Sequence, residues 1–309
     1  MKTASCVAAL VAWALVLSTS VPAQATDPTR VEWSPDWPRV RLAEVAAVVG
    51  LTVGSLAIND DWTPPRHATW SSPILFDKAV RDALRGRTFA AQSTAADVSD
   101  FLYKGTVLGP YIVDVFLVAL SIHESADVAI QMLLMNMQSL GLSGVATLAA
   151  EHAVARARPY TRDCRADGSI VDAQGRPLPT SCGGSADYQS FYSGHTAATA
   201  TMAGLTCAHH QHLPLYGGDA LAEAAPCVLM ITASLATGLT RIIADRHWAT
   251  DVLTGAAIGA MSGYVLPSSL HYGFGHGKVL GEIRHGSVVV VPIPTAYPGG
   301  VGMGVGGVF

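Results

Sequence analysis

The sequence predicts an all-α protein: a bundle of apolar helices followed by a short Gly-rich tail. Half of the 309 residues are apolar and only 14% are Asp, Glu, Lys or Arg, against about 25% charged residues in an average soluble chain. Apolar runs of helical length recur along most of the chain, whereas strand character is confined to a stretch near the C-terminus. A chain of this composition can bury a large core, and it favours contact with a membrane.

Seven segments are expected to be helical. They are residues 39–58, 77–87, 101–121, 126–156, 196–208, 226–244 and 251–266. Pro110 should kink or divide the third of them, because proline lacks the N–H that a helix interior needs. The connection 159–192 is long enough to suggest a functional role. In the Gly-rich tail, 268–309, a strand is expected at 287–293.

The first 25 residues are typical of a secretory signal peptide. Lys2 gives a positive start, an apolar stretch follows at 7–17, and Ala23-Gln24-Ala25 fits the small-x-small cleavage rule. The apolar stretch is shorter than the roughly 20 residues that a spanning helix needs. The expected organisation is a signal peptide at 1–25 and a single helical domain at 26–309, with an uncleaved anchor as the alternative.

Cysteine usage is consistent with export. Cys6 would leave with the signal peptide, so four cysteines remain, an even number of the kind found in oxidising compartments. Four cysteines allow three pairings. Nearest-neighbour pairing gives Cys164–Cys182 across a loop rich in Gly, Pro and Asp, and Cys207–Cys227 across a second connection. Four buried free thiols are the alternative.

The net charge and the composition of the connections between helices indicate in which compartment the domain acts. The formal net charge of −4, with no run of Lys and Arg, gives no footprint for nucleic acid. The connections 122–125 and 209–225 contain no Lys or Arg, so the positive-inside rule assigns no orientation. If the signal is cleaved and every later apolar helix spans, loop 159–192 falls in the cytoplasm, where its disulfide should not form. We therefore expect an exported bundle, periplasmic or associated with the envelope membrane.

Three short segments place polar groups at the ends of apolar helices. At a helix end the backbone has unsatisfied groups, and a site there can face solvent while it rests on rigid elements. The segments are Arg158-Pro159, Ser193-Gly194-His195, and the set Arg241, His247 and Asp251 around the gap between the last two helices.

Several of these groups suit an anion. The guanidinium groups of Arg158 and Arg241 offer fixed forks of donors for phosphate oxygens. Ser193 is a natural N-cap, and the amides after it point outward at the positive end of a helix. The sequence therefore predicts an anion site where these helix ends meet.

The remaining groups suit acid–base chemistry. His247 and Asp251 are four residues apart. If His247 opens the last helix, both lie on one face, and the carboxylate can hold the tautomer of the imidazole as an orienting group holds a nucleophile. His195 is then free to act as a general acid.

In order and spacing, the three segments resemble the signatures KxxxxxxRP, PSGH and SRxxxxxHxxxD of the type 2 phosphatidic acid phosphatases, which are related to bacterial acid phosphatases and vanadium haloperoxidases. The matching stretches are EHAVARARP at 151–159, YSGH at 192–195 and TRIIADRHWATD at 240–251. The third stretch keeps both internal spacings. The resemblance covers about residues 126–266 and implies the helical bundle of that family, with its motif-bearing core in this range.

The resemblance implies a two-step displacement that needs no metal or other cofactor. His247 would attack phosphorus to form a phosphohistidine, with Asp251 orienting it. His195 would protonate the leaving alkoxide and later activate water. The groups that would hold the phosphoryl oxygens are Arg158, Arg241, Ser193 and the Gly194 amide. The expected activity is hydrolysis of a phosphate monoester or a lipid phosphate or diphosphate outside the cytoplasm.

Three positions depart from the signatures. Thr240 replaces Ser and keeps the hydroxyl, and Tyr192 replaces Pro without removing a catalytic group. Glu151 replaces the Lys that resembles a phosphate contact, and a carboxylate there would repel a phosphate dianion. Either a nearby cation, Arg156 or Arg162, fills the gap, or Glu151 contacts an amine or hydroxyl of the substrate, or activity is reduced or lost.

Two other functions stay open at this stage. With Glu151 the protein could bind a phosphorylated lipid or envelope component without turning it over. The same groups could also hold vanadate, as in a vanadate-dependent haloperoxidase, although the chain is short for that branch. The substrate partner is a phosphorylated lipid or a small phosphate ester, and the sequence does not choose between them.

A cluster of histidines invites a metal hypothesis. His209, His210 and His212 lie in what is expected to be a connection between two helices. Histidines in such a connection are usually solvated, so we expect loop histidines here and no metal site.

Overall fold

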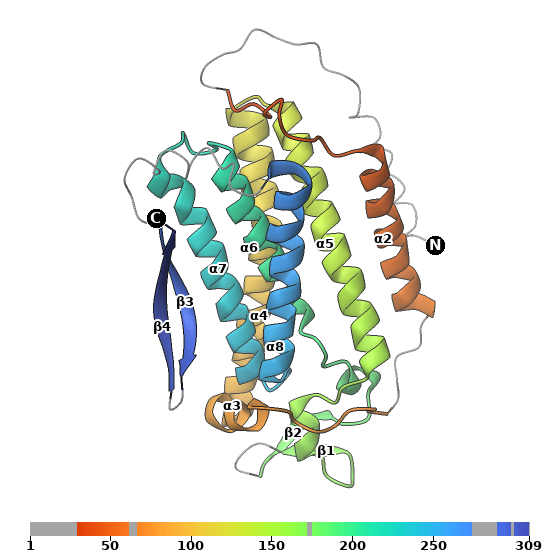
Figure 1. The fold of residues 1–309 in the computed structure, drawn as a ribbon. Coiled ribbons are helices and arrows are strands. Elements are labelled where there is room, and N and C mark those ends of the chain that lie inside the picture. The colour runs from red at the N-terminus through yellow and green to blue at the C-terminus, as the bar shows by residue number, and fades with distance from the viewer. Residues whose placement is uncertain (1–29, 62–66, 172–174, 274–288, 298–299, 309) are drawn as a thin grey trace.

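The computed structural model describes residues 30–61, 67–171, 175–273, 289–297 and 300–308 (Figure 1). The expected signal peptide at 1–25 lies outside these residues. The body of the molecule is the predicted helical bundle. Its α-helices are α2 (Leu42–Asp61), α3 (Asp77–Leu84), α4 (Phe89–Pro110), α5 (Ala126–Val154), α6 (Gly194–His212), α7 (Ala220–Ile243) and α8 (Ala249–Ala260).

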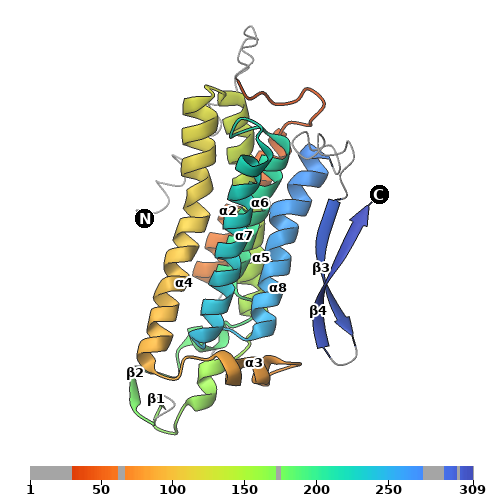
Figure 2. The ribbon, with the colours of Figure 1, turned by 90° about the vertical axis from the view of Figure 1, so that its left-hand side faces the viewer.

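The long helices alternate in direction, so helices that follow one another in the chain meet at shared ends. In Figures 1 and 2, α5 and α7 finish at the lower end of the bundle, and α6 and α8 start there. The short helix α3 and the connection between α5 and α6 lie at the same end. We call this the site end, because all three predicted segments fall there.

Local sequence explains several helix boundaries. The Thr88 side chain accepts a hydrogen bond from the Ala91 amide and caps α4, which therefore begins earlier than predicted. At Pro110 the helix passes into π-helical turns, η1 (Tyr111–Ile122), so the predicted disturbance at this proline is confirmed. Asp219 caps α7 through the amides of Leu221 and Ala222, which starts that helix ahead of Pro226.

Helix α8 continues past its α-helical part. Two π-helical segments, η4 (Met261–Val265) and η5 (Ser268–Tyr272), extend it to the far end of the bundle. The α8 backbone packs directly on α6 because Gly255 and Gly259 lie on the contact face. A Cβ at Gly255 would lie 2.5 Å from the Ser193 carbonyl oxygen, and one at Gly259 would overlap that of Ala197. This close packing fixes the starts of α6 and α8 side by side.

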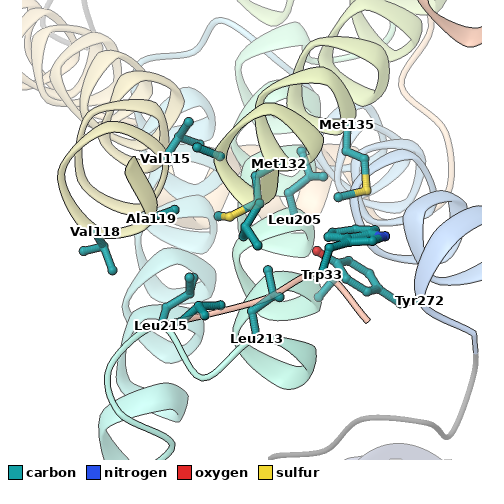
Figure 3. Close-up of a cluster of buried hydrophobic side chains, with 14 of the residues drawn as sticks. Trp33, Val115, Val118, Ala119, Met132, Met135, Leu205, Leu213, Leu215 and Tyr272 are labelled. Carbon is teal, nitrogen blue, oxygen red and sulfur yellow. The ribbon is translucent and has the colours of Figure 1, made fainter. Parts of the chain in front are cut away.

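The hydrophobic core lies toward the end away from the site. It is formed by the first turns of α5, the last turns of α6, η1 and the segment before α2. Figure 3 shows part of this cluster, including Trp33, Val115, Met132, Leu205 and Tyr272. Nearer the site end the buried side chains of α5 are small and polar, as at Ser139, Ser143 and Thr147. The apolar core therefore anchors the bundle while leaving the site end free for polar groups.

The connection between α5 and α6 is compact. It contains the 3-10 helices η2 (Pro159–Asp163) and η3 (Ser185–Tyr188) and a small hairpin of β1 (Ser169–Val171) and β2 (Pro177–Ser181). A disulfide between Cys164 and Cys182 closes it. A second disulfide joins Cys207 of α6 to Cys227 of α7. The nearest-neighbour pairing is confirmed, and the free-thiol alternative is wrong.

The tail forms an antiparallel pair of strands, β3 (Val289–Tyr297) and β4 (Gly300–Val308). The strand predicted at 287–293 is therefore present but begins and ends later. The second strand was not predicted, because glycine-rich segments such as 300–308 have low strand propensity.

The prediction of solvated loop histidines is wrong. Helix α6 runs on to His212, and His209, His210 and His212 are all buried. Their partners come from distant parts of the chain: the Tyr272 hydroxyl and Asn136 contact His209, and the Glu223 carboxylate lies 2.6 Å from Nδ1 of His210. These polar partners make it possible to bury the histidines.

Apolar side chains also cover part of the surface. By length and composition, the helical segments Phe89–Ile122, Ala126–Val154 and Ala220–Ile243 are capable of crossing a membrane. Helices α4 and α7 pack side by side, and large apolar side chains are exposed on both and on η1, which continues α4. We call this surface the apolar belt, and its members include Phe101, Leu108, Ile112, Phe116, Leu117, Val228, Leu229 and Leu235.

Candidate active site

The predicted segments meet at the site end. The amide of Ser193, just before α6, donates to the Asp251 carbonyl oxygen at 3.1 Å. Nη1 of Arg158, just after α5, lies 3.5 Å from Nε2 of His247, just before α8. Helices that are far apart in the sequence thus present Arg, Ser, His and Asp side chains to one small region.

His247 is buried and held in one orientation. Its Nδ1 lies 2.8 Å from the carbonyl oxygen of Ser190, and a carbonyl can only accept, so Nδ1 carries the proton. The lone pair is then on Nε2, the nitrogen beside Arg158. Burial, reinforced by the charge of Arg158 and then of Arg241, holds the pKa of His247 well below its ordinary value. The ring is therefore neutral, as a nucleophile must be.

Asp251 reaches His247 indirectly. Helix α8 starts at Ala249, earlier than predicted, and His247 lies before it, so the condition that His247 opens the helix is not met. The Asp251 Oδ2 lies 4.0 Å from Nδ1 of the histidine. That oxygen instead accepts from the Ser190 hydroxyl at 2.6 Å and from the Trp248 amide at 3.0 Å. Ser190 thus links the carboxylate to the imidazole. Sequence reasoning missed Ser190, because it lies outside the motif spacings.

Arg156 lies behind the site. Its side chain is fully buried and pairs with both Asp251 and Asp77, the latter at 2.5 Å. The guanidinium carbon also lies 3.9 Å from the centre of the Trp70 ring. Burial raises the pKa of Asp251 to about 6, and the charge of Arg156 opposes that rise. Arg156 therefore holds Asp251, and its charge is not available as the missing phosphate contact.

Arg158 is fixed by the backbone around it. Its Nε donates to the Ala186 carbonyl at 2.8 Å, Nη2 to that of Gln189 at 3.1 Å, and Nη1 to that of Arg246 at 3.2 Å. Burial lowers its pKa. Arg162, the other cation suggested for the missing lysine, is exposed on η2. Arg158 thus lies beside His247, whereas the Arg162 side chain is exposed.

Arg241 is buried at the end of α7. Burial lowers its pKa to about 10, and the repulsion of Arg158 and Arg246 adds to this effect. Its Nε has no hydrogen-bond partner among the described residues. An oxyanion bound among the three guanidinium groups would relieve their repulsion and satisfy buried donors. Arg246, which faces the Tyr160 ring at 5.5 Å, is a cation that sequence reasoning missed.

The start of α6 is built as predicted. Ser193 is the N-cap, and its hydroxyl accepts from the Thr196 amide. Gly194 has no room for a side chain, because a Cβ there would lie 2.9 Å from a methyl group of Thr147. Amides at a helix start, with little side chain in front of them, suit close approach by an anion.

His195 faces a helix that carries none of the predicted motifs. Its Nε2 lies 2.9 Å from Oδ1 of Asp100, and the Tyr103 ring is 4.7 Å away; both residues belong to α4. Burial and, after it, the charge of Arg241 lower the pKa of His195 to about 4, against the opposing influence of Asp100.

Glu151 also belongs to the site. Its Oε1 lies 4.0 Å from the point where a Cβ on Gly194 would be. Burial raises its pKa to about 7, against the influence of Arg158 and Arg241. Within the described residues, its carboxyl makes no hydrogen bond or ion pair. Near neutral pH, the Glu151 carboxyl group can therefore be protonated and neutral.

Comparison with known proteins agrees with this geometry. The model of the PAP2 superfamily matches residues 133–274, which carry all three motif segments together with Ser190 and Arg246. Neither the curated proteins nor the solved structures gave a match to this chain. The helical fold and the arrangement of helix ends agree with the family match, and this part of the chain, residues 133–274, belongs to the PAP2 superfamily.

Proposed function

We propose that the protein is a metal-independent phosphatase that hydrolyses a phosphate monoester or a lipid phosphate through a phosphohistidine on His247. The family implies phosphatase-type activity. The observation that carries the proposal is the state of His247: the ring is buried, its Nδ1 is fixed by a carbonyl, and its Nε2 faces Arg158. A neutral, oriented imidazole beside a guanidinium suits in-line attack on a phosphoryl group.

In the first step, the lone pair of His247 Nε2 forms a bond to phosphorus. The ester P–O bond breaks, and protonated His195 gives its proton to the leaving oxygen. The electron pair of the broken bond stays on the alcohol. The developing charge on the phosphoryl oxygens is stabilised by Arg158 and Arg241 and by amides at the start of α6.

In the second step, His195, now neutral, takes a proton from water. The water oxygen attacks phosphorus, the P–N bond breaks, and its electron pair returns to Nε2 of His247. Inorganic phosphate leaves, and His195 is again protonated. Ser190 and Asp251 keep the imidazole in one tautomer through both steps.

Arg158, Arg241 and Arg246 form a cluster of cations that binds the phosphate. Arg246 is close enough to Arg158 and Arg241 to lower the pKa of both. It compensates for the lysine that Glu151 replaces. Positive charge of this density stabilises a phosphoryl transition state without help from a metal ion.

The direct test is a substrate panel. Purified protein is incubated with lipid and soluble phosphate esters in excess EDTA, and released phosphate is measured. We expect turnover of at least one class, unchanged by the chelator. Activity that disappears with EDTA and returns with a divalent cation would overturn the metal-independent mechanism.

Glu151 should make turnover fall in alkaline solution. Because its pKa is raised to about 7, the carboxyl is neutral below that pH and becomes an anion facing the substrate above it. We expect this deprotonation to add a decline in kcat/KM of about tenfold per pH unit above pH 7 to 8, beyond the loss that follows from deprotonation of His195. Glu151→Gln should retain activity at pH 6 and remove this added decline. A variant with the same alkaline decline would show that Glu151 does not cause it.

The binding-only alternative has its own test. In a degenerate site, the wild type would turn over slowly at every pH, and Glu151→Lys would raise the rate sharply by restoring a cation. Our proposal instead expects Glu151→Lys to give no such gain, because Arg246 already supplies the charge. A large gain from a near-zero wild-type rate would favour the binding protein.

We further propose that the domain is exported and works against a lipid surface. One disulfide closes the connection at the site end, and the other lies roughly 20 Å along α6 from that end. Disulfides form in oxidising compartments, so we infer that both of these parts of the bundle lie on the oxidising side of the membrane. The apolar belt supplies the lipid contact. Proteolysis of the 159–192 connection in intact spheroplasts is expected, and its protection would contradict export.

A further inference from the structure

Helix α4 contributes side chains to the site although it lies outside the residues that match the family. Its residue Asp100 lies 33 residues before residue 133, where the match begins. Its Oδ1 lies 2.9 Å from Nε2 of His195 and 3.5 Å from Nη1 of Arg241. One turn farther along α4, the Tyr103 ring packs against the same imidazole. Two side chains of α4 thus hold one face and one nitrogen of His195.

These contacts decide which nitrogen of His195 can serve as the acid. A carboxylate can only accept a hydrogen bond, so Nε2 of His195 carries a proton and donates a hydrogen bond to Asp100. Nδ1 is the remaining ring nitrogen. In the imidazolium form, Nδ1–H is therefore the proton available to a leaving oxygen, and the charge of the ring is balanced by Asp100. This is the arrangement by which a carboxylate orients a catalytic imidazole.

Building on the proposed phosphatase function, we propose that Asp100 is a positioning residue that holds His195 in the tautomer and the protonation state needed to release the leaving group. As the ester P–O bond breaks, His195 Nδ1–H goes to the leaving oxygen, while Nε2–H stays bound to Asp100. In the second half-reaction Nδ1 takes a proton back from water.

The electrostatic surroundings give Asp100 this role. The charged groups that face His195 are Arg241 from α7, Arg158 after α5 and Asp100 from α4. Burial and the two arginines lower the pKa of the imidazole, and Asp100 is the group that raises it. Without the carboxylate, His195 would be protonated only in more acidic solution.

A purely structural role predicts something different. The Asp100 side chain is 52% exposed and that of His195 31%, and exposed ion pairs contribute little to stability, about 0–1 kcal/mol. Asp100→Asn should therefore leave the fold intact. If Asp100 mattered only through Arg241, phosphate binding would weaken equally for every ester, whatever its leaving group.

The experiment compares two substrates of similar shape. Phenyl phosphate has a poor leaving group that needs a proton, whereas p-nitrophenyl phosphate has a good one that does not. For Asp100→Asn we expect kcat with phenyl phosphate to fall about 10- to 100-fold and kcat with p-nitrophenyl phosphate to fall less than about threefold, since a general acid contributes 10²- to 10⁴-fold only where protonation is needed. The pH profile with phenyl phosphate should move to lower pH.

Two further variants keep the test sharp. Asp97→Asn makes the same charge change one turn earlier on α4, at an exposed side chain, and should match the wild type with both substrates. Asp100→Glu keeps the carboxylate and should restore part of the phenyl phosphate rate. Equal losses with both substrates, or no loss with either, would overturn the positioning role. A wild type inactive on every phosphate ester would instead refute the phosphatase function itself.

Discussion

His247→Ala is expected to lower phosphatase turnover on the order of 10⁴-fold or more, because losing a covalent nucleophile removes the reaction path and not just one contact. His247 is the buried imidazole whose Nε2 faces Arg158 and whose Nδ1 donates to the Ser190 carbonyl. The loss should appear in kcat. Substrate should still bind, since the arginines remain.

Two control variants separate chemistry from folding. His247→Asn can still donate a hydrogen bond to the Ser190 carbonyl, yet it has no nucleophilic nitrogen, so it should be as inactive as the alanine variant. His67→Ala removes an exposed histidine and should behave as the wild type. Turnover that survives His247→Asn in a folded protein would assign the nucleophile elsewhere.

Arg156→Met is expected to cost about 3–5 kcal/mol of stability, the usual penalty for removing one partner of a buried ion pair. The guanidinium lies between the carboxylates of Asp77 and Asp251, all three side chains are fully buried, and Thr250 also accepts from it. Methionine fills much of the same volume but leaves two buried carboxylates facing each other. Chemical unfolding followed by tryptophan fluorescence measures the loss.

The cost of Arg156→Met should depend on pH. Burial raises the pKa of Asp251 to about 6 in the folded protein, above its ordinary value of 3.8, and Arg156 opposes that rise. Folding therefore favours the protonated form, and does so more strongly once Arg156 is removed. Stability from this titration is present at low pH and is lost as pH rises through about 6. The variant should therefore be least stable above pH 7 and recover partly at pH 5. Arg162→Met, at an exposed arginine, should change stability by less than about 0.5 kcal/mol. A loss for Arg156→Met no larger than this control, at any pH, would contradict the ion-pair account.

Parts of the site that depend on local pattern could be predicted from the sequence. Ser193 caps α6 because a serine before an apolar run satisfies free amides, and this needs no tertiary information. Arg158, Arg241 and His247 fall at helix ends because the apolar periodicity stops there. The family resemblance then supplied the order in which these ends meet.

Parts that depend on distant partners could not be predicted. Asp100 is separated from His195 by 95 residues, and no spacing rule connects them. Spacing also could not tell that Arg156 pairs with Asp77 of α3 and with Asp251, which makes its charge unavailable to replace the missing lysine. His209 and His210 were misplaced for the same reason: their partners Tyr272 and Glu223 make a polar helix end stable inside the bundle.

The phosphohistidine itself tests the central claim most directly. Wild-type protein is mixed with excess substrate, quenched in alkali within the first turnovers, and digested for peptide mass spectrometry. The account predicts one phosphoryl group on the peptide containing His247, stable in alkali, released by acid, and absent from His247→Asn. A phosphoryl group on a serine, or steady turnover with no phosphorylated His247 at any time point, would contradict it.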